Sequence, residues 1–515
     1  MTGSGRFAPQ LAERALSALS NPARRARTIA TILLAYVVLW TLYGIIAKGS
    51  QDIHFDMSEQ FVLGREPALG YPKHPPLTML IVRLWFAVFP AADWAYYLLA
   101  MANAALALWI AWRLSARFMD EDKRLLGLAL LMLVPFFNFH ALKFNPNTVL
   151  MPLWAATTLF FLRSFETRGP RDAIFAGLLA AAAMYGKYWS AVLLLGLAAA
   201  ALMDSRRGSY FRSPAPWVTM LAGAAAMTPH LLWLVAHDFL PFSYAVSVHG
   251  DASPASVLAG VVGYLAGSLA YVAVPLLIVF FLTRPSRKAL ADMAWPSAPA
   301  RKLAARAFWA TLLLPALLAP MIGVRLTSLW SMSAWTLLPV MLLSSPLVTI
   351  TRKDAAGALA VALALPLIMI AAAPAIGFAM HRNGEAREGH SSLLARPLER
   401  LWRETTDLPL TLFGSMDVLT YGVSFYLPEH PSAVHVLERP ATAEEGALIS
   451  KYGVALLCPA SSAACVAGAD AMAAKSQASK RCEVEISRRY LGKEGPSERY
   501  LIVAIPPLPP AQKIP

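Results

Sequence analysis

The residues best suited to acid–base chemistry lie in one stretch near the N-terminal end, QDIHFDMSEQFVLGREPALGYPKHPPL, residues 51–77. Asp56 and Glu59 would be i,i+3 neighbours on one face of a helix, with apolar residues between them. Carboxylates set against apolar walls at a membrane surface can act as general bases. The residue types leave one alternative open, a solvated loop in which both carboxylates simply contact water.

The second half of this stretch carries cations. Tyr71, Lys73 and His74 lie in GYPKHPPL, and the paired prolines favour an extended turn leading into the following apolar segment. We expect Lys73 and His74 to lie at the level of the lipid headgroups, where they could bind a lipid phosphate. An ordinary interfacial lysine, with its ammonium group in water, explains the same pattern.

Three more cations accompany apolar runs further along the chain. Lys143 lies in LKFNPNTVL, Lys187 in MYGKYW, and Arg325 just before another apolar run. Cations that converge on one cavity would suit a phosphate-bearing substrate. We count Tyr71, Lys143, Asn147 and Tyr188 as candidate substrate-binding residues, although each lysine alone could also be an interfacial anchor.

A histidine-rich segment, PHLLWLVAHDF, adds His230, His237 and Asp238 as candidate substrate-binding residues. Histidine and carboxylate side chains can also bind a divalent metal, but these spacings match no standard zinc motif. A metal site therefore stays an alternative beside a sugar pocket or helix caps. No cofactor is required by the pattern.

The elements that carry these residues are membrane helices. The chain is 57% apolar and only 15% charged, whereas about 25% of residues are charged in an average soluble domain. A spanning helix needs about 20 mostly apolar residues, and such runs recur up to residue 380. The fold class predicted is a polytopic α-helical membrane protein with eleven crossings. The expected spans are 28–48, 93–112, 125–142, 146–162, 173–186, 188–203, 216–236, 254–283, 307–323, 326–349 and 355–379.

The net charge of +14 indicates how the chain inserts. Residues from 381 onward carry fifteen basic and fifteen acidic side chains, so the whole excess belongs to the apolar part. The positive-inside rule then places the N-terminus and the basic loops in the cytoplasm. The excess therefore signals orientation and does not indicate nucleic-acid binding. We expect a multi-pass protein of the bacterial inner membrane with a periplasmic C-terminal domain.

These boundaries give three parts. Residues 1–27 form a cytoplasmic basic arm, 28–380 a transmembrane domain with a first external loop at 49–92, and 381–515 an extracytoplasmic domain. Within the loop, 77–89 is expected to be an interfacial helix. Residues 173–203 are expected to form two short helices that meet at Lys187, with one long tilted helix as the alternative.

The tail alternates strand-like and helix-like segments. Strands are expected at 408–413, 433–437, 453–457, 482–488 and 500–505, and helices at 416–427, 442–452 and 464–476. This alternation predicts a small α/β domain whose last two strands form a hairpin. Cys458, Cys465 and Cys482 all lie there, so one disulfide and one thiol could form, with the pairing left open.

Several motifs in this order resemble a known family. They are FDMSEQ followed by GYPKHPPL, then KFNPNTVLMPLW, GLLAAAAMYGKYWSAVLLLG and PHLLWLVAHDF, spread over most of residues 30–350. The chain resembles the GT-C glycosyltransferases of the protein O-mannosyltransferase and lipid A aminoarabinose transferase type. The resemblance implies a membrane enzyme that transfers one sugar, with inversion, from a polyprenyl phosphate to a lipid, glycan or protein acceptor on the periplasmic face.

The resemblance also implies roles for particular residues. Asp56 would be the catalytic base, with Glu59 supporting it or binding the sugar. The phosphate of the donor would be bound by Lys73, His74, Lys187 and Arg325. This chain departs from the family pattern at Met57, which separates the two acids, at His74, where relatives often have Lys, and at Asn147, where an Asp is common.

Two other classes of protein share some of these features. A transporter or lipid flippase would also have many spans, but transporters usually place polar groups near the midplane and often contain repeats. The charges here gather at the outer surface, and no repeat is visible. A non-catalytic envelope-assembly protein on the same scaffold is the second alternative.

Overall fold

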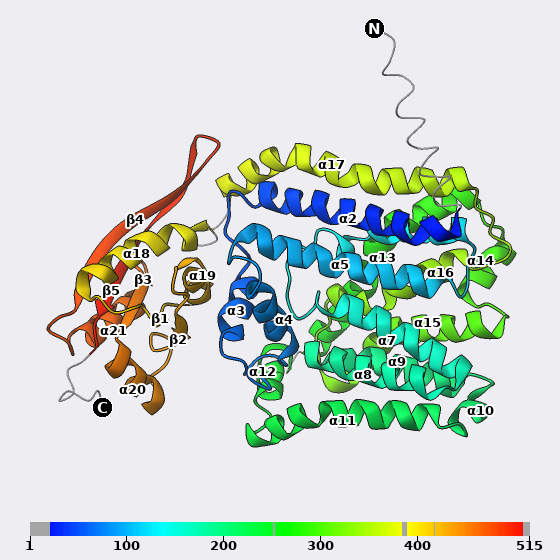
Figure 1. Ribbon diagram of the computed structural model, residues 1–515, viewed down its shortest axis with the longest axis horizontal. Helices are drawn as coiled ribbons and strands as arrows, with labels where there is room; N and C mark the ends of the chain where they lie inside the picture. Colours follow the sequence, from blue (N-terminus) through cyan, green and yellow to red (C-terminus); the bar gives the residue numbers. More distant parts are fainter. Residues whose placement is uncertain (1–20, 251–252, 384–388, 417, 508–515) are drawn as a thin grey trace, which may run out of the picture. The chain divides into compact units, whose positions relative to one another are not determined.

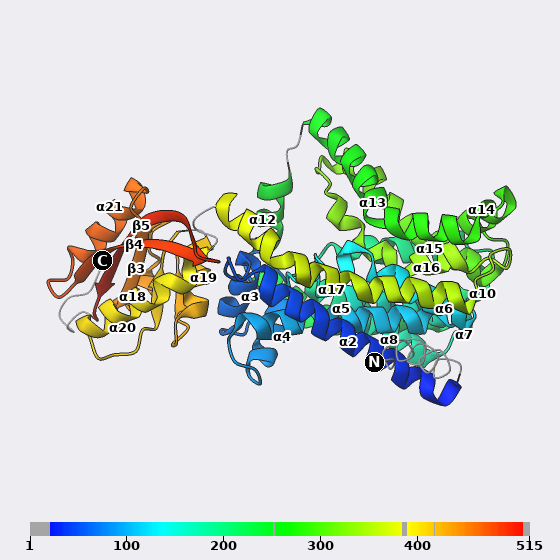
Figure 2. The same ribbon diagram turned by 90° about the horizontal axis from the view of Figure 1, so that it is seen from above.

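Six long apolar helices could cross a membrane in the part of the chain that the computed structural model describes, residues 21–250, 253–383, 389–416 and 418–507. They run largely along one direction, with α13 inclined to the others (Figures 1 and 2). They are α2 (Pro22–Ala47), α5 (Asp93–Ser115), α11 (Ala215–Ala236), α13 (Pro254–Thr283), α15 (Pro299–Ile322) and α17 (Arg352–Asn383). Residues 1–20 of the predicted N-terminal arm lie outside the described residues.

The remaining helices are shorter. Between the long helices lie α3 (Phe55–Gly64), α4 (Leu77–Phe86), α6 (Glu121–Met132), α7 (Leu150–Thr167), α8 (Pro170–Gly186), α9 (Ser190–Met203), α10 (Arg207–Phe211), α12 (Leu240–His249), α14 (Arg287–Ala294) and α16 (Leu338–Leu343). Two 3-10 helices are η1 (Pro135–Phe137) and η2 (Ser328–Leu337). The polytopic helical class is confirmed, while the count of eleven crossings stays a prediction.

Two expected spans are broken. The segment predicted at 125–142 is helical only to Met132, because Pro135 has no N–H to donate and Val134 before it is extended. The segment predicted at 326–349 consists of η2 and the short helix α16. Pro339 and Pro346 interrupt this apolar run. Apolarity alone therefore overestimated the length of both helices.

The alternative of one long helix at 173–203 is wrong. Helix α8 ends at Gly186, Lys187 has an extended backbone, and α9 begins at Ser190. The predicted break at Lys187 is confirmed. At 1.5 Å per residue, the 17-residue α8 rises about 25 Å.

The chain divides into two units. The first combines residues 1–41, 68–78 and 98–368, and the second combines 42–67, 79–97 and 369–515. In the first unit α8 packs against α7 and α11, and α9 packs against α15. A Cβ atom at Gly177 would lie 2.3 Å from the carbonyl oxygen of Thr219, so only glycine allows α8 and α11 to approach this closely.

The second unit contains the predicted α/β domain. Its strands are β1 (Leu412–Gly414), β2 (Ser432–Val434), β3 (Val454–Pro459), β4 (Lys480–Tyr490) and β5 (Lys493–Ile505). They form one sheet in the order β2-β1-β3-β5-β4, with β1 parallel to β2 and β3, and β5 antiparallel to β3 and β4. The expected hairpin is the long β4–β5 ribbon (Figure 1).

Helices cover both faces of this sheet. They are α18 (Ser391–Thr405), α19 (Val418–Tyr426), α20 (Ala443–Tyr452) and α21 (Ala463–Ala473), of which α18 was not predicted. Alternate side chains of β3 and β5 pack into two apolar cores, one on each face of the sheet, since successive residues of a strand point to opposite faces. Leu457 and Ile502 pack with α18 and α19, whereas Leu456 and Val503 pack with α20 and α21.

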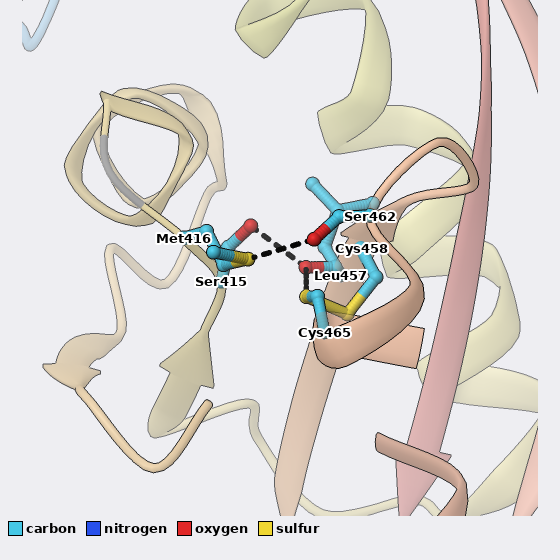
Figure 3. The surroundings of a disulfide bond; sticks show 6 residues. All are labelled: Ser415, Met416, Leu457, Cys458, Ser462 and Cys465. Atoms are coloured by element: carbon cyan, nitrogen blue, oxygen red, sulfur yellow. Dashed lines mark hydrogen bonds between the residues drawn. A yellow bond between two sulfur atoms is a disulfide. The ribbon is translucent and has the colours of Figure 1, made fainter. Parts of the chain in front are cut away.

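A disulfide joins Cys458 at the end of β3 to Cys465 in the first turns of α21 (Figure 3). Nearby, the Ser415 hydroxyl donates to the Leu457 carbonyl at 2.7 Å, which ties the end of β1 to β3. Cys482 is the free cysteine. The structure thus settles the pairing that the sequence left open.

Candidate active site

Asp56 lies in the first turn of α3, in the second unit. His54 is the N-cap residue, and its Nδ1 accepts a hydrogen bond from the Asp56 N–H at 3.1 Å. The side chain of Asp56 is 28% exposed, and its Oδ1 lies 3.8 Å from His54 Nδ1. A carboxylate in the first turn of a helix interacts favourably with the positive end of the helix dipole.

Glu59 lies one turn further along α3 and is only 3% exposed. Burial raises the pKa of the Tyr421 hydroxyl on α19, and the nearby charge of Glu59 adds to that shift. A buried acid next to a tyrosine has little access to a substrate. Of the two roles predicted for Glu59, support of the α3 helix and of Asp56 therefore fits this environment better than sugar binding.

Helix α3 is held by groups of the same unit. The Tyr96 hydroxyl donates to the carbonyl of Met57 at 2.7 Å. Phe61 makes edge-to-face contacts with Phe86 of α4 and Phe425 of α19. Helix α3 of the first external loop is therefore packed against α4 and α19 within the second unit.

The residue pair Asp52 and Arg488 strengthens this attachment. Asp52 Oδ1 accepts a hydrogen bond from the Ser392 hydroxyl at 2.6 Å and lies 2.5 Å from Arg488 Nη2. Arg488 also donates to the carbonyl of Gly389 at 2.7 Å. Burial raises the pKa of the Asp52 carboxyl, although Arg488 and Ser392 oppose that shift.

In the first unit, Lys187 lies at the break between α8 and α9. Its Nζ donates to Asn147 Oδ1 at 2.7 Å. Asn147 is fixed in turn by the preceding loop, where Asn145 Oδ1 accepts from the N–H groups of Asn147 and Thr148 at 2.9 and 3.1 Å. Asn147, one of the three residues that depart from the family pattern, is thus the hydrogen-bond partner of a predicted phosphate-binding lysine.

Tyr188 and His230 form a second polar pair. His230 Nδ1 lies 2.6 Å from the carbonyl of Leu69, so this nitrogen carries the proton and donates it. His230 Nε2 is then the acceptor for the Tyr188 hydroxyl at 2.8 Å. The buried His230 therefore links the α8–α9 break to the segment that carries Lys73.

The turn that carries Lys73 is closely packed. Its Tyr71 N–H donates to the His74 carbonyl at 3.0 Å. A Cβ atom at Gly70 would lie 2.3 Å from the ring of Trp233, so only glycine fits beneath that ring. Lys73 Nζ lies 5.8 Å from the centre of the Tyr244 ring on α12, within the range of a cation–π interaction.

Helix α12 connects these groups. Tyr244 contacts Lys73, while Phe242 stacks on Tyr188 with ring centres 4.7 Å apart. The structure thus gathers Lys73, Asn147, Lys187, Tyr188 and His230 around the α8–α9 break and α12. Lys143 belongs to the same loop as Asn147, and its carbonyl accepts from the Thr148 hydroxyl at 3.1 Å.

Arg325 lines a cavity of about 570 Å³ that the end of α12 also borders. The cavity walls include Val248, Gly260 and Ser328. A Cβ atom at Gly260 would lie 3.1 Å from Arg325 Cγ, so this glycine lets the arginine segment approach α13. An exposed guanidinium in a cavity of this size can receive an anionic group.

His237 and Asp238 lie at an exposed turn between α11 and α12. His237 Nδ1 hydrogen-bonds to the carbonyl of Trp233 at 2.8 Å, so it caps the end of α11. Asp238 has a left-handed backbone with φ 50°. Among the described residues, no group of three histidine, cysteine or acidic side chains is placed to hold a metal ion.

Comparisons with known proteins agree with this architecture. Residues 73–233 match the family model of dolichyl-phosphate-mannose-protein mannosyltransferases. The structure of ArnT from Cupriavidus metallidurans bound to undecaprenyl phosphate has a TM-score of 0.61 and 12% identity, covering 95% of this chain and 99% of that one. The apo structure of this ArnT has a TM-score of 0.59 and 12% identity, covering 93% and 98%. No curated protein sequence matches the chain.

The chain has a GT-C glycosyltransferase fold. The predicted resemblance and the predicted class of enzyme, a glycosyltransferase, are confirmed. The matched segment of this GT-C fold, residues 73–233, runs from Lys73 through Asn147, Lys187 and Tyr188 to His230. It therefore contains the whole cluster that the structure gathers in the first unit.

Several residues that position the candidate site were not predicted. Tyr244 and Phe242 lie in α12, where the sequence shows only an aromatic run, and Gly260 lies inside a span. Arg488 is separated from Asp52 by 436 residues, so no local pattern could connect them. The sequence signal for His54 was its place just before the helix-forming run, which is where an N-cap residue lies.

Proposed function

We propose that the protein is a membrane glycosyltransferase that takes one sugar from a polyprenyl phosphate donor. The acceptor is a lipid, a glycan or a protein on the periplasmic face of the bacterial inner membrane. The observation that carries this proposal is the cluster of Lys73, Lys187, Tyr188 and His230 within the segment that matches the mannosyltransferase model. The solved ArnT of the same fold binds undecaprenyl phosphate.

The proposed reaction is a single displacement with inversion. The acceptor hydroxyl oxygen forms a bond to the anomeric carbon while the bond from that carbon to the donor phosphate oxygen breaks. The proton of the hydroxyl passes to the Asp56 carboxylate, and the polyprenyl phosphate leaves as an anion. This leaving group needs stabilisation of negative charge, which cations supply. We assign that role to Lys73, His74, Lys187 and Arg325.

The hydrogen bond between Lys187 and Asn147 supports this assignment. Asn147 holds the ammonium group through this hydrogen bond and, unlike an aspartate, adds no negative charge to the contact. Lys187 is thereby held as a cation for the donor phosphate. Tyr188, Lys143 and Tyr71 would contribute hydrogen-bond or stacking contacts to the donor, and we keep His237 and Asp238 as substrate-binding candidates at the edge of the site.

Orientation is part of the proposal. The disulfide between Cys458 and Cys465 supports a C-terminal domain in an oxidising compartment, because disulfides are rare in the cytoplasm. The excess of basic residues in the predicted cytoplasmic loops supports an N-terminus inside the cell. Thiol labelling of Cys482 from outside the membrane would test both together, and labelling only from the cytoplasmic side would contradict them.

The function is tested with the purified full-length protein in lipid vesicles. Polyprenyl phosphate sugars are supplied with a membrane extract as acceptor, and products are identified by mass spectrometry. We expect transfer by the wild type, a loss of at least about 100-fold for Asp56→Asn, and little change for Asp354→Asn as a control. Transfer retained by a folded Asp56→Asn protein would remove Asp56 as the base. If only the lipid moved between leaflets, the protein would be a flippase.

A further inference from the structure

An apolar cavity of about 340 Å³ lies within the first unit, and none of the candidate site residues lines it. Its walls come from α7, α8, α9 and α11, which run side by side in Figure 1, and α10 borders one end. Ala180 of α8, Ala198 of α9 and Gly223 of α11 are among the lining residues. Small side chains at these positions leave the space unfilled.

Helix packing keeps this space open. The close approach of Gly177 to Thr219 fixes the separation of α8 and α11 beside the cavity. The Thr219 hydroxyl is used within the protein, since it donates to the carbonyl of Ala173 at 3.0 Å. The cavity is therefore lined almost entirely by carbon atoms. The cavity volume lies at the lower end of the range of about 300–1,000 Å³ that is typical of ligand pockets.

The charges beside α10 are unbalanced. Asp204 pairs with Arg206 at 2.9 Å and Arg306 at 3.1 Å, and Glu166 pairs with Arg206 at 2.8 Å. Asp172 is likewise bound by Arg163, at 2.9 Å. Other guanidinium groups of these segments have no carboxylate within ion-pair distance among the described residues. They belong to Arg168, Arg171, Arg207 and Arg212.

Helix α10 links the cavity to these charges. Tyr210 and Phe211 line the cavity, while Arg207 begins the helix and Arg212 follows its last residue. Both arginines are exposed. An apolar chamber between membrane helices thus adjoins two exposed guanidinium groups that pair with no carboxylate in the described part of the chain.

We propose that this cavity and α10 form a binding site for an anionic phospholipid. One acyl chain occupies the cavity, and the lipid phosphate binds Arg207 and Arg212. Basic groups at the ends of membrane helices recognise anionic headgroups in this way. A zwitterionic lipid would fill the cavity equally well but would leave the arginines without a net negative partner. The proposal does not depend on the glycosyltransferase reaction.

The test uses the full-length protein, stripped of co-purified lipid and examined by native mass spectrometry. Titration with phosphatidylglycerol is compared with phosphatidylcholine of the same acyl chains. We expect one phosphatidylglycerol to bind at least tenfold more tightly. Ala180→Phe and Ala198→Phe should abolish this adduct by filling the cavity, whereas Leu195→Phe, on the exposed side of α9, should retain it. If either cavity-filling phenylalanine variant fails to fold, Ala180→Leu is tested in its place.

The headgroup contacts are tested separately. Arg207→Gln combined with Arg212→Gln should reduce phosphatidylglycerol binding to the level of phosphatidylcholine, while Lys288→Gln, an exposed control on α14, should leave the preference intact. Equal binding of both lipids by the wild type would overturn the anionic site. An adduct that survives in the filled-cavity variants would also overturn it, because the lipid would then be bound elsewhere.

Discussion

The guanidinium of Arg488 on β4 lies against the carboxylate of Asp52, in a pair whose side chains are only 16% and 6% exposed. Asp52 lies four positions before the proposed base, Asp56, so the last hairpin of the chain helps to hold the first external loop. Tyr426 adds a second link, because its hydroxyl accepts from the N–H of Ile53 at 3.0 Å. The C-terminal domain is therefore part of the support for α3.

Replacing Arg488 should loosen this loop. Arg488→Ala leaves the buried carboxylate of Asp52 without its cation, and breaking such a pair costs about 3–5 kcal/mol. We expect faster hydrogen–deuterium exchange in peptides covering residues 49–64 and a fall in transferase activity. Exchange in these peptides is measured on the full-length protein by mass spectrometry.

The neighbouring residue provides the control. Arg489 pairs with Glu494, but their side chains are 70% and 66% exposed, so Arg489→Ala should change exchange little. Asp52→Asn should be milder than Arg488→Ala, because it removes the buried charge itself and lets Ser392 keep a hydrogen bond. Equal exchange in Arg488→Ala and Arg489→Ala would show that the pair does not hold the loop.

Gly70→Ala should displace the turn that carries Lys73. The added methyl group would lie 2.3 Å from the Trp233 ring, so either the turn or the ring must move. We expect at least a tenfold loss of activity, appearing mainly as a raised KM for the donor. Gly357→Ala, in α17, is the matched control, because a Cβ atom there has no neighbour within 4 Å. A Gly70→Ala enzyme with wild-type KM would refute the assigned role of this turn.

Removing the charge of Lys187 should weaken binding of the lipid phosphate. Lys187→Gln keeps a hydrogen-bond donor near Asn147 but has no charge for the phosphate. The loss of one charged contact of about 1.5–3 kcal/mol corresponds to at least tenfold weaker binding of undecaprenyl phosphate. Microscale thermophoresis would measure this, with Lys353→Gln, an exposed residue of α17, as the control. Unchanged affinity would exclude Lys187 from the phosphate site.

Asn147→Asp tests the same contact by adding a negative charge to the hydrogen-bond partner of Lys187. A carboxylate 2.7 Å from the Lys187 ammonium would compensate its charge and should weaken phosphate binding by several-fold. The measurement is again the affinity for undecaprenyl phosphate, with Asn147→Ser separating the effect of charge from the loss of the hydrogen bond. Tighter binding by Asn147→Asp would mean that orientation of Lys187 matters more than its net charge.

The sequence predicted what depends on local pattern. The break at Lys187 followed from the Gly186–Lys187 interruption between two apolar runs, and the strands followed from short apolar stretches between turns. The broken segment after Met132 was missed because residues up to 142 remain apolar although they are not helical. Hydropathy indicates whether a segment lies in an apolar environment. It does not indicate whether the backbone of that segment forms the hydrogen bonds of a helix.

The candidate site shows the same division. Lys73, Lys187 and His230 were identified by residue type and by family resemblance, but their contacts with Tyr244, Asn147 and Leu69 required the tertiary structure. These partners are ordinary residues whose importance comes only from where the fold brings them. No single-sequence pattern marks a carbonyl such as that of Leu69 as a histidine acceptor.

The stability of the C-terminal domain should depend on pH through His390. The Tyr500 hydroxyl donates to Glu498 Oε2 at 3.0 Å, so its oxygen accepts from His390 Nδ1 at 2.9 Å. Burial lowers the pKa of His390 in the folded protein. Below about pH 6.5, the pKa of a histidine in the unfolded chain, the unfolded chain binds a proton that the folded chain does not bind. The free energy of unfolding therefore decreases as the pH is lowered, by at most about 1.4 kcal/mol per pH unit.

Hydrogen exchange of β3 and β5 peptides, corrected for the intrinsic effect of pH, would measure this loss between about pH 7.5 and 5. Burial lowers the pKa of His430 as well, so two histidines contribute with the same sign. His390→Gln keeps a donor for Tyr500 but cannot take up a proton, and it should remove roughly half of the pH dependence. His430→Gln should act similarly. A pH dependence that persists undiminished in the double variant would mean that other groups cause it.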